Sequence, residues 1–230
     1  MFNIYAKKRF FPYLSPCYPK GIILTKLILA GLIISNVIFA QSDFYLKIEL
    51  LSDSIITNRK IILKDDVVKA DLLNSQALDL CSNEVSESLL LSTFCTLPYR
   101  QIPIKIPLLG ISYRIPLPTV SEGKFKEVVS SVPANLFFDT DIHSLDRDKL
   151  THFFGNAFLS YNFPRFNFSK FMGILIELFE ESFVSSGEFD LRDMMVNALG
   201  AWFGFELHNN PRLQPSSILR QYSLLYFRFY

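Results

Sequence analysis

The sequence predicts a mainly helical α+β protein, in which a strand- and proline-containing N-terminal half precedes a C-terminal three-helix bundle. Half of the 230 residues are hydrophobic, which is enough for a sizeable core. Residues 98–118 contain five prolines, which remove backbone donors and disfavour helix. Residues 148–204 contain three apolar runs in which polar and small residues recur at helical spacing. We therefore divide the chain into four parts: 1–40, 41–120, 121–210 and 211–230.

Residues 1–40 have the layout of a secretory signal. Lys20 and Lys26 precede an uncharged apolar run, residues 27–40, and polar residues follow it. A basic region, an apolar core of about 7 to 15 residues and a small residue at the cleavage site are typical of such signals. The run is shorter than the roughly 20 apolar residues of a membrane span. We predict an exported protein, in the periplasm or on a membrane of the cell envelope, with a signal peptide cleaved after Ala40 or with an uncleaved signal anchor.

Three cysteines are present: Cys17, Cys81 and Cys95. Cleavage of the signal would remove Cys17 and leave the other two in an exported chain. There they can form a disulfide, and two free buried thiols are the alternative. The sequence has no Cys-x-x-Cys spacing, so the cysteines do not predict a zinc site.

Residues 41–120 are predicted to contain strands and an extended segment. Apolar and polar residues alternate from Phe44 to Leu50, as in a half-buried strand, and residues 60–64 are a second candidate strand. Residues 65–91 have a weaker, helical pattern. The proline-rich residues 98–118 are predicted to be extended, either as a strap over the helical domain or as a binding surface for a protein partner.

The helical part, residues 121–210, carries a narrow polar line on each of two predicted helices. The first line consists of Asp148, His152, Gly155 and Asn156, and the second consists of Asp193, Asn197, Gly200 and Gly204. At 100° per residue each set falls on one side of its helix. The positions around them are mostly large and apolar: Phe153, Phe154, Phe158, Met195, Leu199, Trp202 and Phe203. We infer that the lines face each other or a pocket, that the glycines allow close packing, and that the large residues pack outward against protein or lipid.

An acidic loop, residues 139–148, leads into the first of these helices. It invites a calcium interpretation, but its residues do not have the ligand spacing of an EF-hand. We predict instead that Asp146 caps the helix and that Asp148 lies in its first turn, beside the positive end of the helix dipole.

A middle helix is predicted around Gly173 to Glu181. Glu177 and Glu181 lie four residues apart on one side of it, with Glu180 next to them. They form either an ordinary solvated face or part of the polar site, where a cation or His152 would relieve their mutual repulsion.

Three motifs occur in a fixed order in this region. They are Asp148-Lys149-x-x-His152, Gly173-x-x-x-Glu177 and Asp193-x-x-x-Asn197-x-x-Gly200. Together they resemble the VanZ-like family and the YfiM-type periplasmic lipoproteins over about a quarter of the chain. The resemblance implies a protein of the bacterial cell envelope, and it implies no catalytic residues. The chain differs from the VanZ-like pattern in having one strongly apolar N-terminal run, and from the lipoproteins in lacking a Cys after that run.

The candidate polar site consists of seven residues that can ligate a metal or form hydrogen bonds: Asp148, His152, Asn156, Glu177, Glu181, Asp193 and Asn197. These ligand types suit zinc, manganese or iron, so a divalent metal is a candidate cofactor. The alternatives are a buried hydrogen-bond network that sets the helix register and a pocket for a polar headgroup or a glycan. Motifs for nucleophilic catalysis, such as Gly-x-Ser-x-Gly, are missing from the sequence.

The net charge of +1 gives no electrostatic basis for nucleic-acid binding. We predict an envelope protein without catalytic activity that associates with a membrane or another envelope component. The alternative is a metal-dependent hydrolase acting on an envelope lipid or glycan. Residues 211–230 form an aromatic tail without an assigned role.

Overall fold

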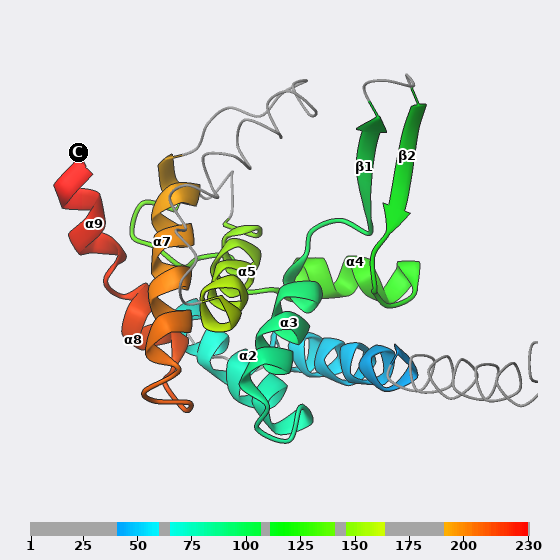
Figure 1. Cartoon of the computed structure of the whole chain (residues 1–230), viewed down its shortest axis with the longest axis horizontal. Coiled ribbons are helices and arrows are strands. Elements are labelled where there is room, and N and C mark those ends of the chain that lie inside the picture. The colour runs from blue at the N-terminus through cyan, green and yellow to red at the C-terminus, as the bar shows by residue number, and fades with distance from the viewer. Residues whose placement is uncertain (1–40, 60–64, 107–110, 141–145, 164–190, 230) are drawn as a thin grey trace, which may run out of the picture. The chain divides into compact units, whose positions relative to one another are not determined.

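The computed structural model describes residues 41–59, 65–106, 111–140, 146–163 and 191–229 (Figure 1). The chain divides into two units, residues 1–42 and 43–230, and the described elements belong to the second. These elements are mainly helical, as predicted. Among the described residues, we find no helix with both the length and the apolar character that a membrane span requires.

The strand predicted from Phe44 to Leu50 is wrong, because these residues belong to a helix that covers residues 41–59. Three buried apolar side chains recur on it at helical spacing: Ile48, Leu51 and Ile55. Leu46 and Leu50, which the alternation would have buried, are 57% and 45% exposed. The longer helical period therefore decides the structure of this segment. The second predicted strand, residues 60–64, lies outside the described residues.

Two further helices follow, α2 (Asp66–Leu80) and α3 (Val85–Thr96), and they pack against each other. The Asp65 carboxylate accepts a hydrogen bond of 2.9 Å from the Val67 N–H and so caps α2. In the turn that follows α2, Ser82 and Asn83 have φ values of 54° and 67°. This left-handed turn reverses the chain and brings α3 back along α2.

Residues 98–118, predicted to be extended, contain the strands β1 (Gln101–Ile106) and β2 (Ile111–Pro116). The strands are antiparallel, with Gln101 opposite Pro116. Helix α4 (Glu122–Ser131) follows β2 in the chain.

The C-terminal elements are α5 (Lys149–Asn162), α7 (Leu191–Glu206), α8 (Pro215–Leu219) and α9 (Tyr222–Phe229). Helices α5 and α7 lie side by side and share the largest contact between described helices, and α3 packs against α5 as well (Figure 1). The middle helix predicted around residues 173–181 lies outside the described residues. The packing around α5 therefore involves α7, as predicted, and also α3.

The large residues predicted to pack outward lie largely in the protein core. Five are buried: Phe153, Phe154, Met195, Leu199 and Phe203. Phe153 stacks on Phe203 across the two helices, with ring centroids 5.1 Å apart. Phe158 is partly buried, whereas Trp202 is exposed. Protein rather than lipid therefore covers most of this set.

Cys81 and Cys95 are free and buried. This agrees with the second of the two predicted alternatives. Burial raises the pKa of both thiols to about 12, so each is protonated at neutral pH.

Asp66 connects α2 to the segment after α4, across the boundary predicted at residue 120. Its Oδ2 accepts hydrogen bonds from the N–H groups of Ala134 and Asn135, at 3.0 and 2.9 Å. Its Oδ1 accepts one of 2.7 Å from Lys69. Burial by itself would raise the pKa of Asp66, but these three donors lower it below its ordinary value. The two halves of the chain are therefore joined by polar contacts.

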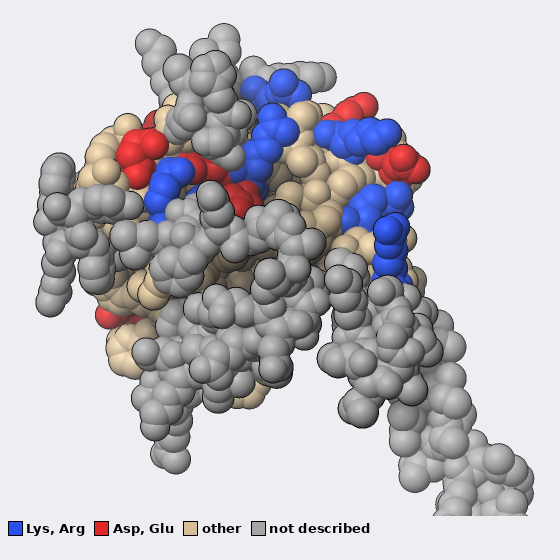
Figure 2. Space-filling view, turned by 90° about the horizontal axis from the view of Figure 1, so that it is seen from above, with Lys and Arg blue, Asp and Glu red and all other residues tan. Residues whose placement is uncertain are grey.

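Exposed charges are mixed in sign. Lys47 pairs with Asp43 and Glu87, at 2.6 and 2.8 Å, and Lys124 makes a similar double pair. Figure 2 shows Lys and Arg side chains next to Asp and Glu side chains on one face. Screened pairs of this kind contribute little to stability.

Candidate functional site

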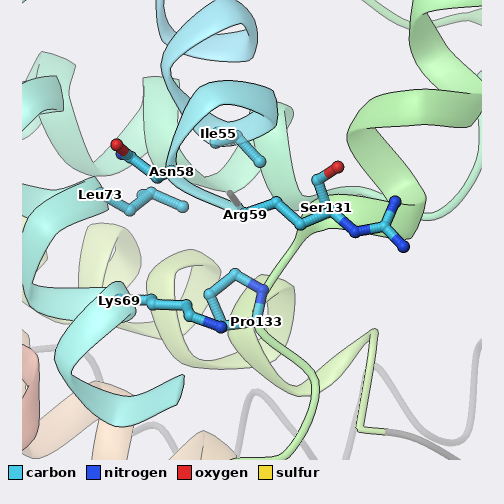
Figure 3. A pocket seen from close by; sticks show the side chains of 7 residues that line it. All are labelled: Ile55, Asn58, Arg59, Lys69, Leu73, Ser131 and Pro133. Atoms are coloured by element: carbon cyan, nitrogen blue, oxygen red, sulfur yellow. The ribbon is translucent and has the colours of Figure 1, made fainter. Parts of the chain in front are cut away.

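One hollow lies between the helix of residues 41–59, α2 and the end of α4 (Figure 3). Ile55 and Leu73 provide its apolar lining, and Arg59, Lys69 and Pro133 lie around it. Its volume of about 10 Å³ is no more than a water molecule needs. It is therefore too small to be a ligand site.

A larger pocket, of about 400 Å³, lies beside α5. Its lining comes from α3, from the residues just after α3, from α5 and from Asn197 on α7. The volume falls in the range of about 300 to 1,000 Å³ that is usual for small-molecule sites. Four members of the predicted polar site line it: Asp148, His152, Asn156 and Asn197.

The structure brings together five of the seven residues of the predicted polar site: Asp148, His152, Asn156, Asp193 and Asn197. Asp148 is the N-cap of α5, His152 and Asn156 lie on α5, and the other two lie on α7. Glu177 and Glu181 are outside the described residues. The predicted contact between the first and third helices through their polar lines is therefore present.

A chain of hydrogen bonds determines the roles of the polar atoms in this contact. Asn156 Nδ2 donates to the His152 backbone carbonyl, at 2.7 Å, so this atom must be the amide nitrogen. It also donates to Asn197 Oδ1, at 2.6 Å. Because that oxygen can only accept, His152 Nδ1, at 3.1 Å, must carry a proton and donate to it. The other ring nitrogen, Nε2, therefore remains for an external partner.

His152 Nε2 points at two carboxylates. It lies 4.0 Å from Asp148 Oδ2 and 3.7 Å from Asp193 Oδ1. A nitrogen lone pair facing two anionic oxygens is repelled unless a proton or a cation lies between them. These three residues each offer one ligand atom, and the atoms all lie within 4.8 Å of one another.

Lys149 supplies positive charge to the same cluster. Its side chain is only 6% exposed, and its Nζ lies 2.5 Å from Asp193 Oδ1 and 3.5 Å from Asp148 Oδ1. A buried ammonium requires such partners, since desolvation is costly. The lysine thus links the first turn of α5 to the first turn of α7.

One acceptor in the pocket has no partner. Asn156 is 8% exposed, and its Oδ1 makes no hydrogen bond among the described residues. Both N–H groups of this amide are already used, as described above. An unpaired buried acceptor costs about 1 to 3 kcal/mol. A ligand in the pocket that reaches this oxygen with a hydrogen-bond donor would therefore be favoured.

Two of the three predicted glycines allow the close approach of α5 and α7. A Cβ added at Gly200 would lie 2.2 Å from the carbonyl oxygen of Phe153, and one at Gly204 would lie 2.2 Å from that of Ala157. Gly155 differs, because an added Cβ would meet Thr93 at an ordinary 3.6 Å. Close packing of α5 on α7 thus requires glycine at residues 200 and 204.

Tyr99 forms part of the pocket wall and is 49% exposed. Burial, and secondarily the negative charge of Asp148, raises the pKa of this phenol above its ordinary value. Its hydroxyl is therefore protonated at neutral pH and can donate. Sequence reasoning missed Tyr99, because it lies in the proline-rich half and reaches the site only through the packing of α3 on α5.

Arg192 was also missed, and Lys149 was named in the first motif without a role of its own. Each precedes or follows a predicted site residue in the chain: Lys149 comes after Asp148, and Arg192 comes before Asp193. Lys149 is the one Lys or Arg within α5, which is a signal that sequence reasoning could have used. A lysine that is buried in a helix requires a counter-charge.

Arg192 explains the acidic loop before α5. It lies 2.8 Å from Asp146 and 3.3 Å from Asp139. The predicted capping role of Asp146 is wrong: Asp148 occupies the N-cap position, while the Asp146 carboxylate is buried against Arg192 and Thr140. Burial raises the pKa of Asp146 even so. The loop's counter-ion is thus an arginine.

Comparison with known protein families, with curated proteins and with solved structures found no match to this chain. The resemblance to the VanZ-like and YfiM-type proteins stays a prediction.

Proposed function

We propose that this chain is an exported protein of the bacterial cell envelope that binds a hydroxyl-rich glycan in the pocket beside α5, without catalysing a reaction. The single observation that supports this most is the unpaired, buried Oδ1 of Asn156 in a pocket of about 400 Å³. Sugar hydroxyls donate hydrogen bonds to such acceptors, and Asp148 offers further acceptors at the same pocket. The half-exposed ring of Tyr99 provides an apolar surface against which a sugar ring can pack.

A glycan suits this pocket better than an anionic lipid headgroup does. A phosphate placed there would face the carboxylate of Asp148, which lines the pocket, whereas Lys149 pairs most closely with Asp193. Like charges repel each other, and solvent screens this repulsion because the Asp148 side chain is 44% exposed. The Asp148 carboxylate therefore favours a neutral, hydroxyl-bearing ligand over an anion at this end of the pocket.

The association with a membrane is part of the proposal. Three large apolar residues on one side of α7 are exposed: Met194, Trp202 and Phe205. Exposed apolar and aromatic side chains gathered on one helix face mark a contact surface, which suits a membrane or another protein. This face supports a peripheral position of the chain.

Replacement of Tyr99 by alanine is expected to weaken glycan binding by about 5-fold, the equivalent of about 1 kcal/mol. The probe is a neutral N-acetylglucosamine oligosaccharide, titrated into the purified protein by calorimetry. Tyr45→Ala is the matched control. Tyr45 is also exposed, but it lies on the helix of residues 41–59 and does not line the pocket, so this variant should bind normally. No binding by the unmodified protein, or equal binding by the Tyr99 variant, would contradict the proposal.

Export is tested separately by sequencing the N-terminus of the protein isolated from the envelope fraction. A chain that starts at Gln41 supports a cleaved signal peptide, which we expect from the layout of residues 1–40. An intact Met1 on a protein found outside the envelope fraction would contradict export.

The second candidate function is a metal-dependent hydrolase acting on an envelope lipid or glycan. One observation favours it: His152 Nε2 lies between two carboxylates, as in a site for a divalent ion. Cleavage of the same oligosaccharide in the presence of Zn²⁺, but not after chelation, would support the hydrolase over the binding protein.

A further inference from the structure

We infer that Asp148, His152 and Asp193 form a binding site for a divalent transition-metal ion, and that Lys149 occupies the ion's place when the metal is absent. This site does not require the proposed glycan ligand, because its three ligand groups come from the protein itself.

The hydrogen bonds of His152 leave Nε2 as the ring nitrogen that can bind a metal ion. The hydrogen bonds that start at the His152 backbone carbonyl place the ring proton on Nδ1, facing Asn197 Oδ1. Metal-bound histidines almost always donate this other ring proton to an oxygen acceptor, which orients the ring. Asn197 supplies that acceptor here, so Nε2 is the ring nitrogen directed at the two carboxylates.

The ligand atoms of the three residues have a spacing close to that of a tetrahedral metal site. Nε2 lies 3.7 Å from Asp193 Oδ1 and 4.0 Å from Asp148 Oδ2. Ligands at about 2.0 to 2.2 Å from a tetrahedral ion are separated by about 3.3 to 3.6 Å from one another. Small side-chain rotations of the two carboxylates therefore suffice to complete three ligands. One nitrogen with two carboxylate oxygens suits Zn²⁺, Mn²⁺ or Fe²⁺ better than it suits Ca²⁺ or Mg²⁺.

The unpaired Oδ1 of Asn156 is a second observation, and it does not depend on the three ligand residues. Asn156 is more than nine-tenths buried and lines the same pocket as Asp148 and His152. A metal ion held by three protein groups retains at least one water molecule, whose O–H groups are strong donors. A water of this kind is the type of donor that Asn156 Oδ1 lacks within the protein.

Lys149 supplies the positive charge that pairs with these carboxylates. Its ammonium lies 2.5 Å from Asp193 Oδ1, the same oxygen that faces His152 Nε2. An ammonium on that oxygen weakens the binding of a metal ion there, because the two positive charges repel each other. Movement of the lysine toward Asp148 Oδ1, 3.5 Å away, or toward the pocket would relieve this repulsion. Lys149 is a competitor of the metal and keeps the carboxylates paired without it.

The test uses the purified full chain after chelator treatment, titrated with Zn²⁺ by calorimetry and with Co²⁺ by visible absorption. We expect one ion per chain and Co²⁺ d–d bands. His152→Gln should lower the Zn²⁺ affinity at least about 10-fold. His208→Gln is the matched control, since His208 is exposed and stacks on Tyr161 away from the cluster, and it should bind Zn²⁺ normally.

Lys149→Met distinguishes a metal site from an ordinary ion-paired cluster. We expect this variant to bind Zn²⁺ at least about 10-fold more tightly, because the competing ammonium is gone. Weaker binding by a folded Lys149 variant, equal binding by His152→Gln, or missing Co²⁺ bands in the unmodified protein would each overturn the inference. If Lys149→Met does not fold, the two histidine variants and the Co²⁺ spectrum still decide. Glycan titration of the same metal-free protein shows separately whether the proposed function fails.

Discussion

Replacement of Gly200 by alanine is expected to destabilise the protein by about 3 kcal/mol or more. The added methyl group would lie 2.2 Å from the carbonyl oxygen of Phe153 and 2.9 Å from two of its backbone carbons. A backbone cannot move aside as a flexible side chain can, so α5 and α7 would have to separate. Separation would also weaken the stacking of Phe153 on Phe203 and the hydrogen bonds of Asn197. Urea denaturation followed by circular dichroism measures the loss.

Gly155→Ala is the control for this prediction, because it makes the same chemical change in the partner helix. Its methyl group would meet Thr93 at 3.6 Å, an ordinary contact. Alanine favours helix over glycine by about 1 kcal/mol, so Gly155→Ala should leave stability unchanged or raise it slightly. Equal losses for the two variants would show that the close approach of α5 and α7 does not explain the effect at Gly200.

Replacement of Arg192 by leucine is expected to cost about 3 to 5 kcal/mol of the free energy of unfolding. The guanidinium lies between Asp139 and Asp146 and donates a hydrogen bond of 3.3 Å to the Tyr222 hydroxyl. Asp146 is only 1% exposed, so loss of the arginine would leave a buried carboxylate without its main positive partner. Such a carboxylate must either stay charged and buried without a counter-ion or take up a proton, and both are unfavourable at neutral pH.

Arg220→Leu is the matched control for Arg192→Leu. Arg220 pairs with Asp65 at 3.2 Å, but its side chain is 61% exposed. Exposed pairs contribute about 0 to 1 kcal/mol, so this variant should be close to the unmodified protein in urea denaturation. A second check is the double variant Arg192→Leu, Asp146→Asn, which should recover part of the loss because the unpaired charge is removed. A loss at Arg192 no larger than that at Arg220 would contradict the structural role of the buried cluster.

The contact between α5 and α7 could be predicted from the sequence because both helices are long enough for their period to be read. Asp148, His152 and Asn156 repeat every four residues, and Asp193 and Asn197 do the same. Nothing in seven alternating residues, by contrast, separates a strand from a helix, which is why Phe44 to Leu50 was wrongly predicted. Long segments specify which face is buried, whereas short ones leave the secondary structure open.

The remaining parts of the site depend on contacts between segments that are distant in the sequence. Thr151 donates to the Thr96 carbonyl, at 2.7 Å, and so holds α5 against the end of α3. This contact brings Tyr99 to the pocket, and no periodicity in either segment records it. The long side chains of Lys149 and Arg192 reach carboxylates on other segments. Lys149 reaches Asp193 on α7, and Arg192 reaches Asp146 in the loop before α5. The residues that position and balance the site were therefore harder to predict than the residues that form it.

The hydrogen bond from Asn156 to the His152 carbonyl has a further consequence. That carbonyl belongs to the backbone of α5, so the orientation of the amide, and through Asn197 the tautomer of the imidazole, is determined once the helix has formed. The site is then preorganised. The conformational entropy of aligning these side chains is lost during folding, and a ligand that arrives later does not have to compensate for it.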